Sequence, residues 1–141
     1  MEYKIYEQPP TPGEYCGLRA LCGLGPRTIE AAKISLPRSL YAVSIRDQSG
    51  KLIGMGRVVG DLGSHVQVVD IAVDPAYQKR GLSRKIMDLI THFVETEVPE
   101  CAFVNLFADI DYLYQKYGFE YPVSKGMFLN RSALQERLGK N

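Results

Sequence analysis

The residues from Val68 to Ile90 constrain the fold of this chain more than any other stretch. They open with the β-branched run VVDIAV, which is typical of a buried strand. Asp74-Pro75 ends that strand, because proline has no N–H group to donate to a sheet. A short basic loop, Gln78 to Ser83, comes next. The stretch therefore predicts a strand, a glycine-bearing loop and a helix in direct succession.

The helix after the loop is predicted from the spacing of its apolar side chains. They recur at helical intervals as far as about Glu97, at Leu82, Ile86, Leu89, Ile90, Phe93 and Val94. A loop that leads into a helix points free N–H groups and the positive end of the helix dipole at an anion, which favours a phosphate site. The patterns GxxxxGK[ST] and GxGxxG are absent, which disfavours a P-loop hydrolase and a dinucleotide-binding fold.

The loop residues Gln78-Lys79-Arg80-Gly81-Leu82-Ser83 resemble the Q/R-x-x-G-x-G/A signature of the GNAT superfamily of acyl-CoA N-acyltransferases. In that family the loop wraps the pyrophosphate of coenzyme A, so the resemblance implies that these residues and Arg84 bind acetyl-CoA. It also implies that Ile71, Ala72 and Val73 supply backbone groups to the pantetheine arm. Ser83 departs from the family's Gly or Ala but is small enough for close approach. The alternative is an ordinary connection with a solvated basic turn.

A second element, LYQKYGF from Leu113 to Phe119, resembles the family's F-Y-E-K-x-G-F. The resemblance implies that Tyr114 is the general acid, because a phenol beside the sulfur can protonate the thiolate that leaves when an amine attacks the thioester. The alternative is a core tyrosine, since nine tyrosines occur in the chain. Asp109 flanks the position where family members often contact the pantetheine arm. It is either such a contact or a helix N-cap.

A general base must take a proton from an ammonium acceptor. Family enzymes often place a glutamate on the strand before the loop, but the matching position holds Gln67, which cannot act as a base. Asp70 is the candidate, directly or through water, or else it pairs with Arg57. His65 titrates in the useful range but is expected to be exposed. A water chain without a dedicated base is the remaining alternative.

The acceptor itself is not selected by the sequence. In the family the helices before Leu36 form the acceptor wall, and here they offer a mixed set of side chains, Tyr15, Arg19, Arg27 and Glu30. Arg57 either binds an acidic group of the acceptor or holds strands together. Polyamines, amino acids, aminoglycosides and peptide N-termini all remain as acceptors.

The rest of the chain predicts one domain over residues 1–141. Strands are expected at Glu2–Tyr6, Leu40–Arg46, Leu52–Val59, His65–Val73 and Ala102–Phe107, the last parallel to the strand before the loop. Helices are expected to start at Thr11, Thr28 and Asp109, the first with Tyr15, Leu18, Leu21 and Cys22 facing inward. The chain is expected to end in a hairpin of Phe119–Pro122 and Lys125–Leu129, followed by a weakly helical tail, Ser132–Leu138. Gly54 and Gly56 leave one strand face bare, with room for a neighbour or a ligand. The fold class is α/β (α+β mixed), a GNAT-type central, mostly antiparallel sheet flanked by helices in the order β-αα-βββ-α-β-α-ββ.

Composition narrows the function further. Seventeen Lys and Arg against 16 Asp and Glu give a net charge of +1, which does not indicate nucleic-acid binding driven by overall charge. The cluster Lys79, Arg80, Arg84 and Lys85 also lacks the aromatic platform of RNA recognition. The cysteines fit no metal motif, so no metal and a reducing, cytoplasmic setting are predicted, with Cys22 and Cys101 buried. No signal peptide or membrane-spanning run is predicted.

These observations predict a cytoplasmic GNAT-type N-acetyltransferase. It would move the acetyl group of acetyl-CoA directly to a primary amine of a small molecule or peptide, without a metal. The competing hypothesis is a non-catalytic acyl-CoA-binding or sensing module with the same fold. A homodimer through edge strands, with the final hairpin as a surface, is a further expectation from the resemblance.

Overall fold

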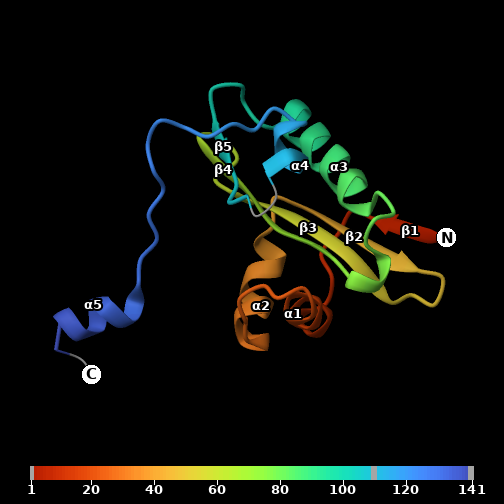
Figure 1. Ribbon diagram of the computed structural model, residues 1–141, viewed down its shortest axis with the longest axis horizontal. Helices are drawn as coiled ribbons and strands as arrows, with labels where there is room; N and C mark the ends of the chain where they lie inside the picture. The colour runs from red at the N-terminus through yellow and green to blue at the C-terminus, as the bar shows by residue number, and fades with distance from the viewer. Residues whose placement is uncertain (1, 109–110, 140–141) are drawn as a thin grey trace.

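One five-stranded sheet forms the centre of the computed structural model, which describes residues 2–108 and 111–139 (Figure 1). Each strand pairs with the next along the chain: β1 (Tyr3–Tyr6), β2 (Tyr41–Asp47), β3 (Leu52–Gly60), β4 (His65–Val73) and β5 (Phe103–Asn105). The first four strands are antiparallel, whereas β5 runs parallel to β4 after the helical crossover. The mixed, mostly antiparallel sheet predicted from the sequence is thus confirmed.

Helices cover both faces of this sheet. One face carries α3 (Leu82–Glu97) and α4 (Asp111–Gln115), and the other carries α1 (Pro12–Leu21) and α2 (Ile29–Ser35), as Figure 1 shows. Short 3₁₀ turns follow α2 at Leu36–Arg38 and precede the loop at Pro75–Tyr77. The sheet therefore separates two hydrophobic layers.

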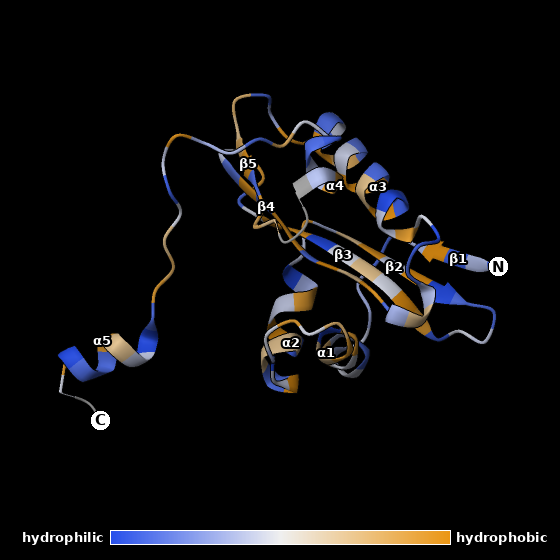
Figure 2. Ribbon diagram, viewed as in Figure 1, coloured by the Kyte–Doolittle hydropathy of each residue, from blue (hydrophilic) through white to orange (hydrophobic). Residues whose placement is uncertain are grey.

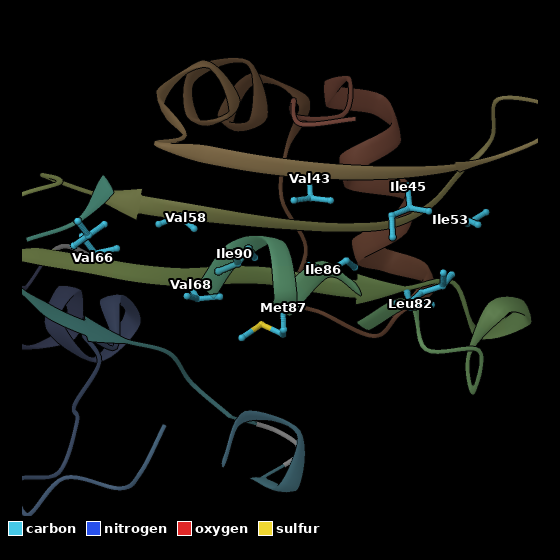
Figure 3. Close-up of a cluster of buried hydrophobic side chains, with 12 residues drawn as sticks. Val43, Ile45, Ile53, Val58, Val66, Val68, Leu82, Ile86, Met87 and Ile90 are labelled. Atoms are coloured by element: carbon cyan, nitrogen blue, oxygen red, sulfur yellow. The ribbon is translucent and has the colours of Figure 1, made fainter. Parts of the chain in front are cut away.

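The larger layer lies between α3 and the sheet (Figure 3). The predicted stripe of α3 supplies Leu82, Ile86 and Ile90, all almost fully buried, and Met87 joins them. They pack on the apolar side chains of the strands, Val43, Ile45, Ile53, Val58, Val66, Val68 and Val73. Burying one such side chain contributes about 1.5–3 kcal/mol, so this layer fixes the position of α3 on the sheet.

Gly54 and Gly56 let α3 approach the sheet closely. A Cβ atom built on Gly56 would lie 2.6 Å from Cγ2 of Ile86 and 2.7 Å from Cδ1 of Ile71, closer than carbon atoms pack. The bare strand face predicted from these glycines is therefore filled by the helix. Of the two alternatives that the sequence left, a neighbour or a ligand, the neighbour is correct here.

The smaller layer lies under α1 and contains Tyr15, Leu18, Ala32, Leu36, Leu52, Met55 and Ala72. The predicted capping box starts α1: Glu14 N–H donates to Oγ1 of Thr11 at 3.3 Å, and Thr11 N–H donates to the Glu14 carboxylate at 3.1 Å. The predicted inward position of Leu21 is wrong, because its side chain is 55% exposed. Arg19 is buried in its place, at 6%.

A β-bulge interrupts β4 beside Asp70. Met55 pairs with Ala72 and Arg57 pairs with Val69, so two residues of β4 oppose the single Gly56. Asp70 itself has a φ of +60°, in the left-handed region. The extra residue reverses the alternation of side chains, so Asp70 faces α1 instead of the layer under α3.

The predicted final hairpin is wrong. No strand follows β5 among the described residues; residues 119–130 have no regular structure, and α5 (Arg131–Arg137) follows them. We call residues 119–139 the arm; Figure 1 shows it leaving the body and carrying α5 away from the sheet. Asp109, the predicted helix cap, lies outside the described residues. No helix of the described chain is long and apolar enough to cross a membrane.

Candidate functional site

Strand β4 has two halves with different neighbours. Its first residues, His65 to Gln67, pair with both β3 and β5. From Val68 to Val73 it pairs with β3 alone, because β5 ends at Asn105. Within the described chain, no strand covers the other edge of this second half. Ile71, Ala72 and Val73, the predicted backbone contacts of the pantetheine arm, lie in this half.

The predicted phosphate loop starts where β4 ends. Its backbone turns through two left-handed positions, Lys79 at φ +65° and Gly81 at φ +79°. Gly81 is the N-cap of α3 and has no side chain with which to cap the helix. The first helical bond, from Lys85 N–H to the Gly81 carbonyl, is 3.1 Å long. The preceding N–H groups of the first turn have no partner within the helix, so they fit an anion at this end.

Side chains of the loop divide into two groups. Lys79, Arg84 and Lys85 are exposed, and no carboxylate of a described residue lies within 4 Å of their charged groups. Leu82 is buried in the core, so only its backbone could touch a ligand. The Gln78 amide donates to the Val73 carbonyl at 3.2 Å and ties the loop to β4.

The remaining loop side chains lie beside these groups. The guanidinium carbon of Arg80 lies 5.6 Å from the centre of the Tyr77 ring, and Ser83 is half-buried. A Cβ atom built on Gly81 would meet nothing within 4 Å, so the space beside the loop is open. The loop thus combines backbone N–H groups without a helical partner, positively charged side chains and open space for a ligand.

The turn that follows α4 is attached to the first turns of α3. The Tyr117 hydroxyl donates to Oδ1 of Asp88 at 2.6 Å and also lies 3.0 Å from the Arg84 carbonyl. Burial and the Asp88 carboxylate raise the pKa of Tyr117 to about 12, so its phenol stays protonated. Tyr114, which lies on α4 itself, is half-buried against the larger core layer, with its ring edge-on to Phe119 at 6.4 Å. The predicted LYQKYGF element therefore packs against the helix that follows the predicted phosphate loop.

Asp70 is the centre of a buried polar cluster on the other face of the sheet. Its Oδ2 accepts from the Tyr15 hydroxyl at 2.8 Å and from Nε of Arg57 at 2.8 Å, and its Oδ1 accepts from Arg19. All three charged side chains are at most 7% exposed. Burial and the Asp70 carboxylate raise the pKa of Tyr15. We call these four residues the Asp70 cluster.

Further hydrogen bonds join the Asp70 cluster to the segments before and after α2. Arg57 Nη1 donates to Oγ of Ser39 at 2.8 Å, and Arg19 donates to the Gly25 carbonyl at 2.7 Å. The pairing of Asp70 with Arg57, one of the two sequence alternatives, is confirmed. Because three donors occupy the carboxylate of Asp70 and its side chain is only 6% exposed, the geometry weighs against a role as base.

The spacing of the apolar residues in β4 carries a sequence signal for this cluster. Val66 and Val68 alternate on the face under α3, but the next residues of that layer are Ile71 and Val73. The spacing of three between Val68 and Ile71 marks the bulge, which turns Asp70 to the other face. Tyr15 and Arg19, expected in the acceptor wall, are buried in the cluster, whereas Arg27 and Glu30 are exposed.

Other predicted candidates lie apart from the loop and the cluster. His65 is exposed, as expected, and so is His92, whereas Gln67 is half-buried in the paired part of β4. The predicted burial of Cys101 is wrong, because this residue follows α3 on the surface. The Cys22 thiol donates to the Val73 carbonyl at 3.3 Å, and burial raises its pKa. Within residues 2–108 and 111–139 no cluster of three or more His, Cys, Asp or Glu could hold a metal ion.

Comparisons with known proteins agree with this arrangement. A family model described as an acetyltransferase (GNAT) domain matches residues 37–121. The chain is 35% identical over 89 residues to GCN5-related N-acetyltransferase 2, chloroplastic, of Arabidopsis thaliana, covering 59% of this chain and 33% of that protein. It is 29% identical over 129 residues to histone acetyltransferase TAP1 of Glycine max, covering 79% of this chain and 54% of that protein. The chain thus spans between a third and about half of the length of these two relatives.

A solved structure is similar over its whole length. Protein SA2161 of meticillin-resistant Staphylococcus aureus, a protein of unknown function, is 41% identical and superimposes with a TM-score of 0.86, covering 92% of this chain and 99% of that one. Together with the family match over residues 37–121, the shared sheet, loop and helix identify the fold. The chain belongs to the GNAT acetyltransferase family.

Proposed function

We propose that this protein transfers the acetyl group of acetyl-CoA directly to a primary amine of a small molecule or peptide. Membership of the GNAT family supports acetyl transfer. The main observation behind the proposal is that the open edge of β4 leads directly into the loop. The backbone of this loop turns through two left-handed positions at the start of α3. An extended thioester with a diphosphate at one end has the shape and charge that this surface complements.

Each part of the surface has a proposed role. The N–H groups from Gly81 to Arg84 bind the diphosphate, with Lys79, Arg80 and Arg84 adding positive charge. Ile71, Ala72 and Val73 offer backbone groups to the pantetheine arm in the way that an edge strand binds a peptide. Asp109 remains a proposed contact of that arm. Acetyl-CoA supplies the activated acyl group, and the chain holds and orients it.

Tyr114 is the proposed general acid, which donates its proton to the sulfur that leaves. Its half-buried position against the larger core layer supports this role, because a phenol partly shielded from water can donate to a thiolate that forms beside it. The base is proposed to be water, because the oxygens of Asp70 are already bound by Tyr15, Arg19 and Arg57. A direct transfer needs no cysteine nucleophile.

The acceptor is proposed to be an amine without a strict requirement for an acidic group. Arg57 was a candidate for binding such a group, but its guanidinium is engaged by Asp70 and Ser39. The Glycine max relative is named a histone acetyltransferase, which supports including lysine peptides among the acceptors to be tested. A cytoplasmic setting is part of the proposal and is supported by the free state of the three cysteines.

The proposal is tested by binding and turnover measured separately. Calorimetry with CoA and acetyl-CoA should detect binding, and release of the CoA thiol should identify an acceptor within a panel of polyamines, amino acids, aminoglycosides, peptide N-termini and lysine peptides. Tyr114→Phe should lower turnover by about 10²-fold or more with unchanged affinity for CoA. Tyr112→Phe is the matched control, because Tyr112 lies on the same helix but is exposed.

Two results would contradict the proposal. Absence of any heat with CoA would remove the assignment of the loop. Binding of CoA without thiol release across the whole panel would favour the non-catalytic acyl-CoA-binding or sensing module. Equal turnover of the Tyr114→Phe and Tyr112→Phe variants would remove Tyr114 from the mechanism while leaving acetyl transfer in place.

A further inference from the structure

A hydrogen bond between Tyr117 and Asp88 joins the segment that carries Tyr114 to helix α3. The phenol oxygen of Tyr117 and Oδ1 of Asp88 are 2.6 Å apart, a distance typical of a hydroxyl that donates to a charged acceptor. The same phenol oxygen lies 3.0 Å from the Arg84 carbonyl, in the first turn of α3. Neither the proposed binding of acetyl-CoA nor the proposed proton transfer uses this hydroxyl. Its role must therefore follow from what it holds in place.

Asp88 lies outside the apolar stripe of α3. Its side chain is exposed, whereas Ile86, Met87 and Ile90 are buried against the sheet. Figure 2 shows hydrophilic and hydrophobic residues alternating along α3, as expected of a helix with only one face on the core. Aspartate is also a weak helix former, so neither core packing nor helix propensity accounts for a carboxylate at this position. The bond to Tyr117 gives this carboxylate a function.

Helix α4 is too short to keep its position without contacts to the rest of the fold. It has five residues, and an isolated helix of this length is unstable in water. Leu113 is buried, and the rings of Tyr114 and Phe119 pack against the larger core layer. Hydrophobic contacts of this kind are non-directional, whereas a hydrogen bond fixes both a distance and an angle. The Tyr117 bond can therefore set where α4 sits on that layer.

The backbone connects Tyr117 directly to Tyr114. The Tyr117 N–H donates to the Tyr114 carbonyl at 3.0 Å, and the Phe119 N–H donates to the same carbonyl at 3.2 Å. A Tyr117 hydroxyl fixed on Asp88 therefore fixes this turn, and the turn fixes the backbone of Tyr114. Such a constraint matters for catalysis, because a misplacement of about 1 Å at the reacting groups can cost about a hundredfold in rate.

We propose that the hydrogen bond from Tyr117 to Asp88 is a latch that positions Tyr114 beside the sulfur of the thioester. Tyr117 and Asp88 are positioning residues, because neither needs to touch the cofactor or the acceptor for this role. The inference rests on the proposed function, in which Tyr114 is the general acid. It attaches that acid to the helix whose first turn is proposed to bind the diphosphate, so the acid and the cofactor share one support.

Single substitutions test the latch through turnover and CoA affinity measured separately. Tyr117→Phe should lower kcat by about tenfold with an unchanged dissociation constant for CoA, because Tyr114 is present but no longer held in place. Asp88→Ala should have the same effect, whereas Asp88→Asn keeps an oxygen that accepts from Tyr117 and should retain most of the turnover. Tyr112→Phe and Glu95→Ala are the matched controls at exposed positions of α4 and α3, and they should match the wild type. Circular dichroism of each variant establishes that it is folded.

A double variant shows whether Tyr117 acts through Tyr114. Tyr114→Phe alone should lower turnover by about 10²-fold or more, and the addition of Tyr117→Phe should lower it no further, because no acid is left to position. A further tenfold loss in the double variant would overturn the proposal, since Tyr117 would then act independently of Tyr114. Wild-type turnover in Tyr117→Phe or Asp88→Ala would also overturn it, as would a loss in Asp88→Asn as large as that in Asp88→Ala.

Hydrogen exchange tests the latch without turnover. The amides of Tyr117 and Phe119 donate to the Tyr114 carbonyl, and in Tyr117→Phe they should exchange at least about fivefold faster than in the wild type, because the turn opens more often. In Tyr112→Phe they should exchange at the wild-type rate. Equal rates in Tyr117→Phe and the wild type would overturn the latch whether or not an acceptor is found. A wild-type chain that binds CoA without any turnover would instead remove the proposed function, and the exchange rates would still decide whether the bond holds the turn.

Discussion

Two groups of cations lie near the open half of β4, and they differ in burial and in pairing. Arg19 and Arg57 are buried under α1, and both donate to Asp70. Lys79 and Arg84 are exposed at the loop, with no carboxylate of a described residue within 4 Å. Burying an unpaired charge costs several kcal/mol, so the first group must be neutralised within the fold. The second group is hydrated and needs no internal partner.

The difference separates structural cations from those available to a ligand. Arg57 and Arg84 carry the same side chain, yet only Arg84 can receive an external anion without giving up an internal ion pair. The Asp70 cluster instead joins α1 to the bulge of β4, which precedes Ile71–Val73. The Asp70 cluster would therefore influence a bound thioester only indirectly, by holding the backbone of Ile71–Val73 in position. Substitutions in the Asp70 cluster should therefore lower the free energy of unfolding. Substitutions at the loop should instead lower the affinity for CoA.

The largest expected effect is the loss of stability in Asp70→Asn. Removing this charge leaves two buried guanidinium groups without a counter-ion, so the free energy of unfolding should fall by about 3–5 kcal/mol. Urea denaturation measures it. Glu95→Gln, an exposed change on α3 of the same type, should stay within about 0.5 kcal/mol of the wild type. A loss below about 1 kcal/mol in Asp70→Asn would mean that other groups neutralise the arginines.

The next effect is on affinity, in Gly81→Glu. A negative side chain at the start of α3 would face the diphosphate, so the affinity for CoA should fall by at least about 2 kcal/mol, roughly thirtyfold. The free energy of unfolding should fall by only about 1 kcal/mol, the cost of a side chain at φ +79° in otherwise open space. Gly50→Glu is the control, because Gly50 has φ +88° and equal space in the β2–β3 turn. Equal affinities in the two variants would contradict the assignment of the loop.

A smaller effect is expected from Arg84→Gln. One exposed charge at the phosphate loop should contribute about 1 kcal/mol to the binding of CoA, or several-fold in the dissociation constant, and less at high salt. Its removal should leave the denaturation midpoint unchanged, because the guanidinium has no ion pair within the described chain. Arg38→Gln changes the net charge equally at another exposed site. If the two variants bind CoA equally, only the overall charge matters.

The sequence predicted well where the determinants are local. The capping box of Thr11 and Glu14 and the apolar stripe of α3 each depend on residues within a few positions, and both are confirmed. The phosphate loop was found because its pattern, strand and helix are contiguous in the chain. Its role in binding stays a prediction.

Prediction was poorer where the determinants are distant in the sequence. Arg19 is buried because Asp70, 51 positions away, compensates its charge, and the bulge that turns Asp70 inward is a property of two paired strands. A hydrophobicity pattern within α1 therefore placed Leu21 inside instead. The final hairpin failed for a related reason: the apolar pattern of residues 119–129 is present, but a strand also needs a paired neighbour.

An effect of similar size is expected at a third kind of cation, Arg46, which is half-buried and so lies between the buried and the exposed groups. Arg46 Nη2 donates to Oε1 of Glu14 at 2.8 Å, and this bond, with those of the capping box, lowers the pKa of Glu14 from 4.5 to about 2. Glu14→Gln should cost about 1 kcal/mol at neutral pH. Because the folded-state pKa is depressed, this contribution is fully present above pH 4.5 and is lost as the pH falls towards 2. The difference in unfolding free energy between wild type and variant, measured in urea across that range, should therefore shrink to nothing; a difference independent of pH would mean that the carboxylate charge contributes nothing.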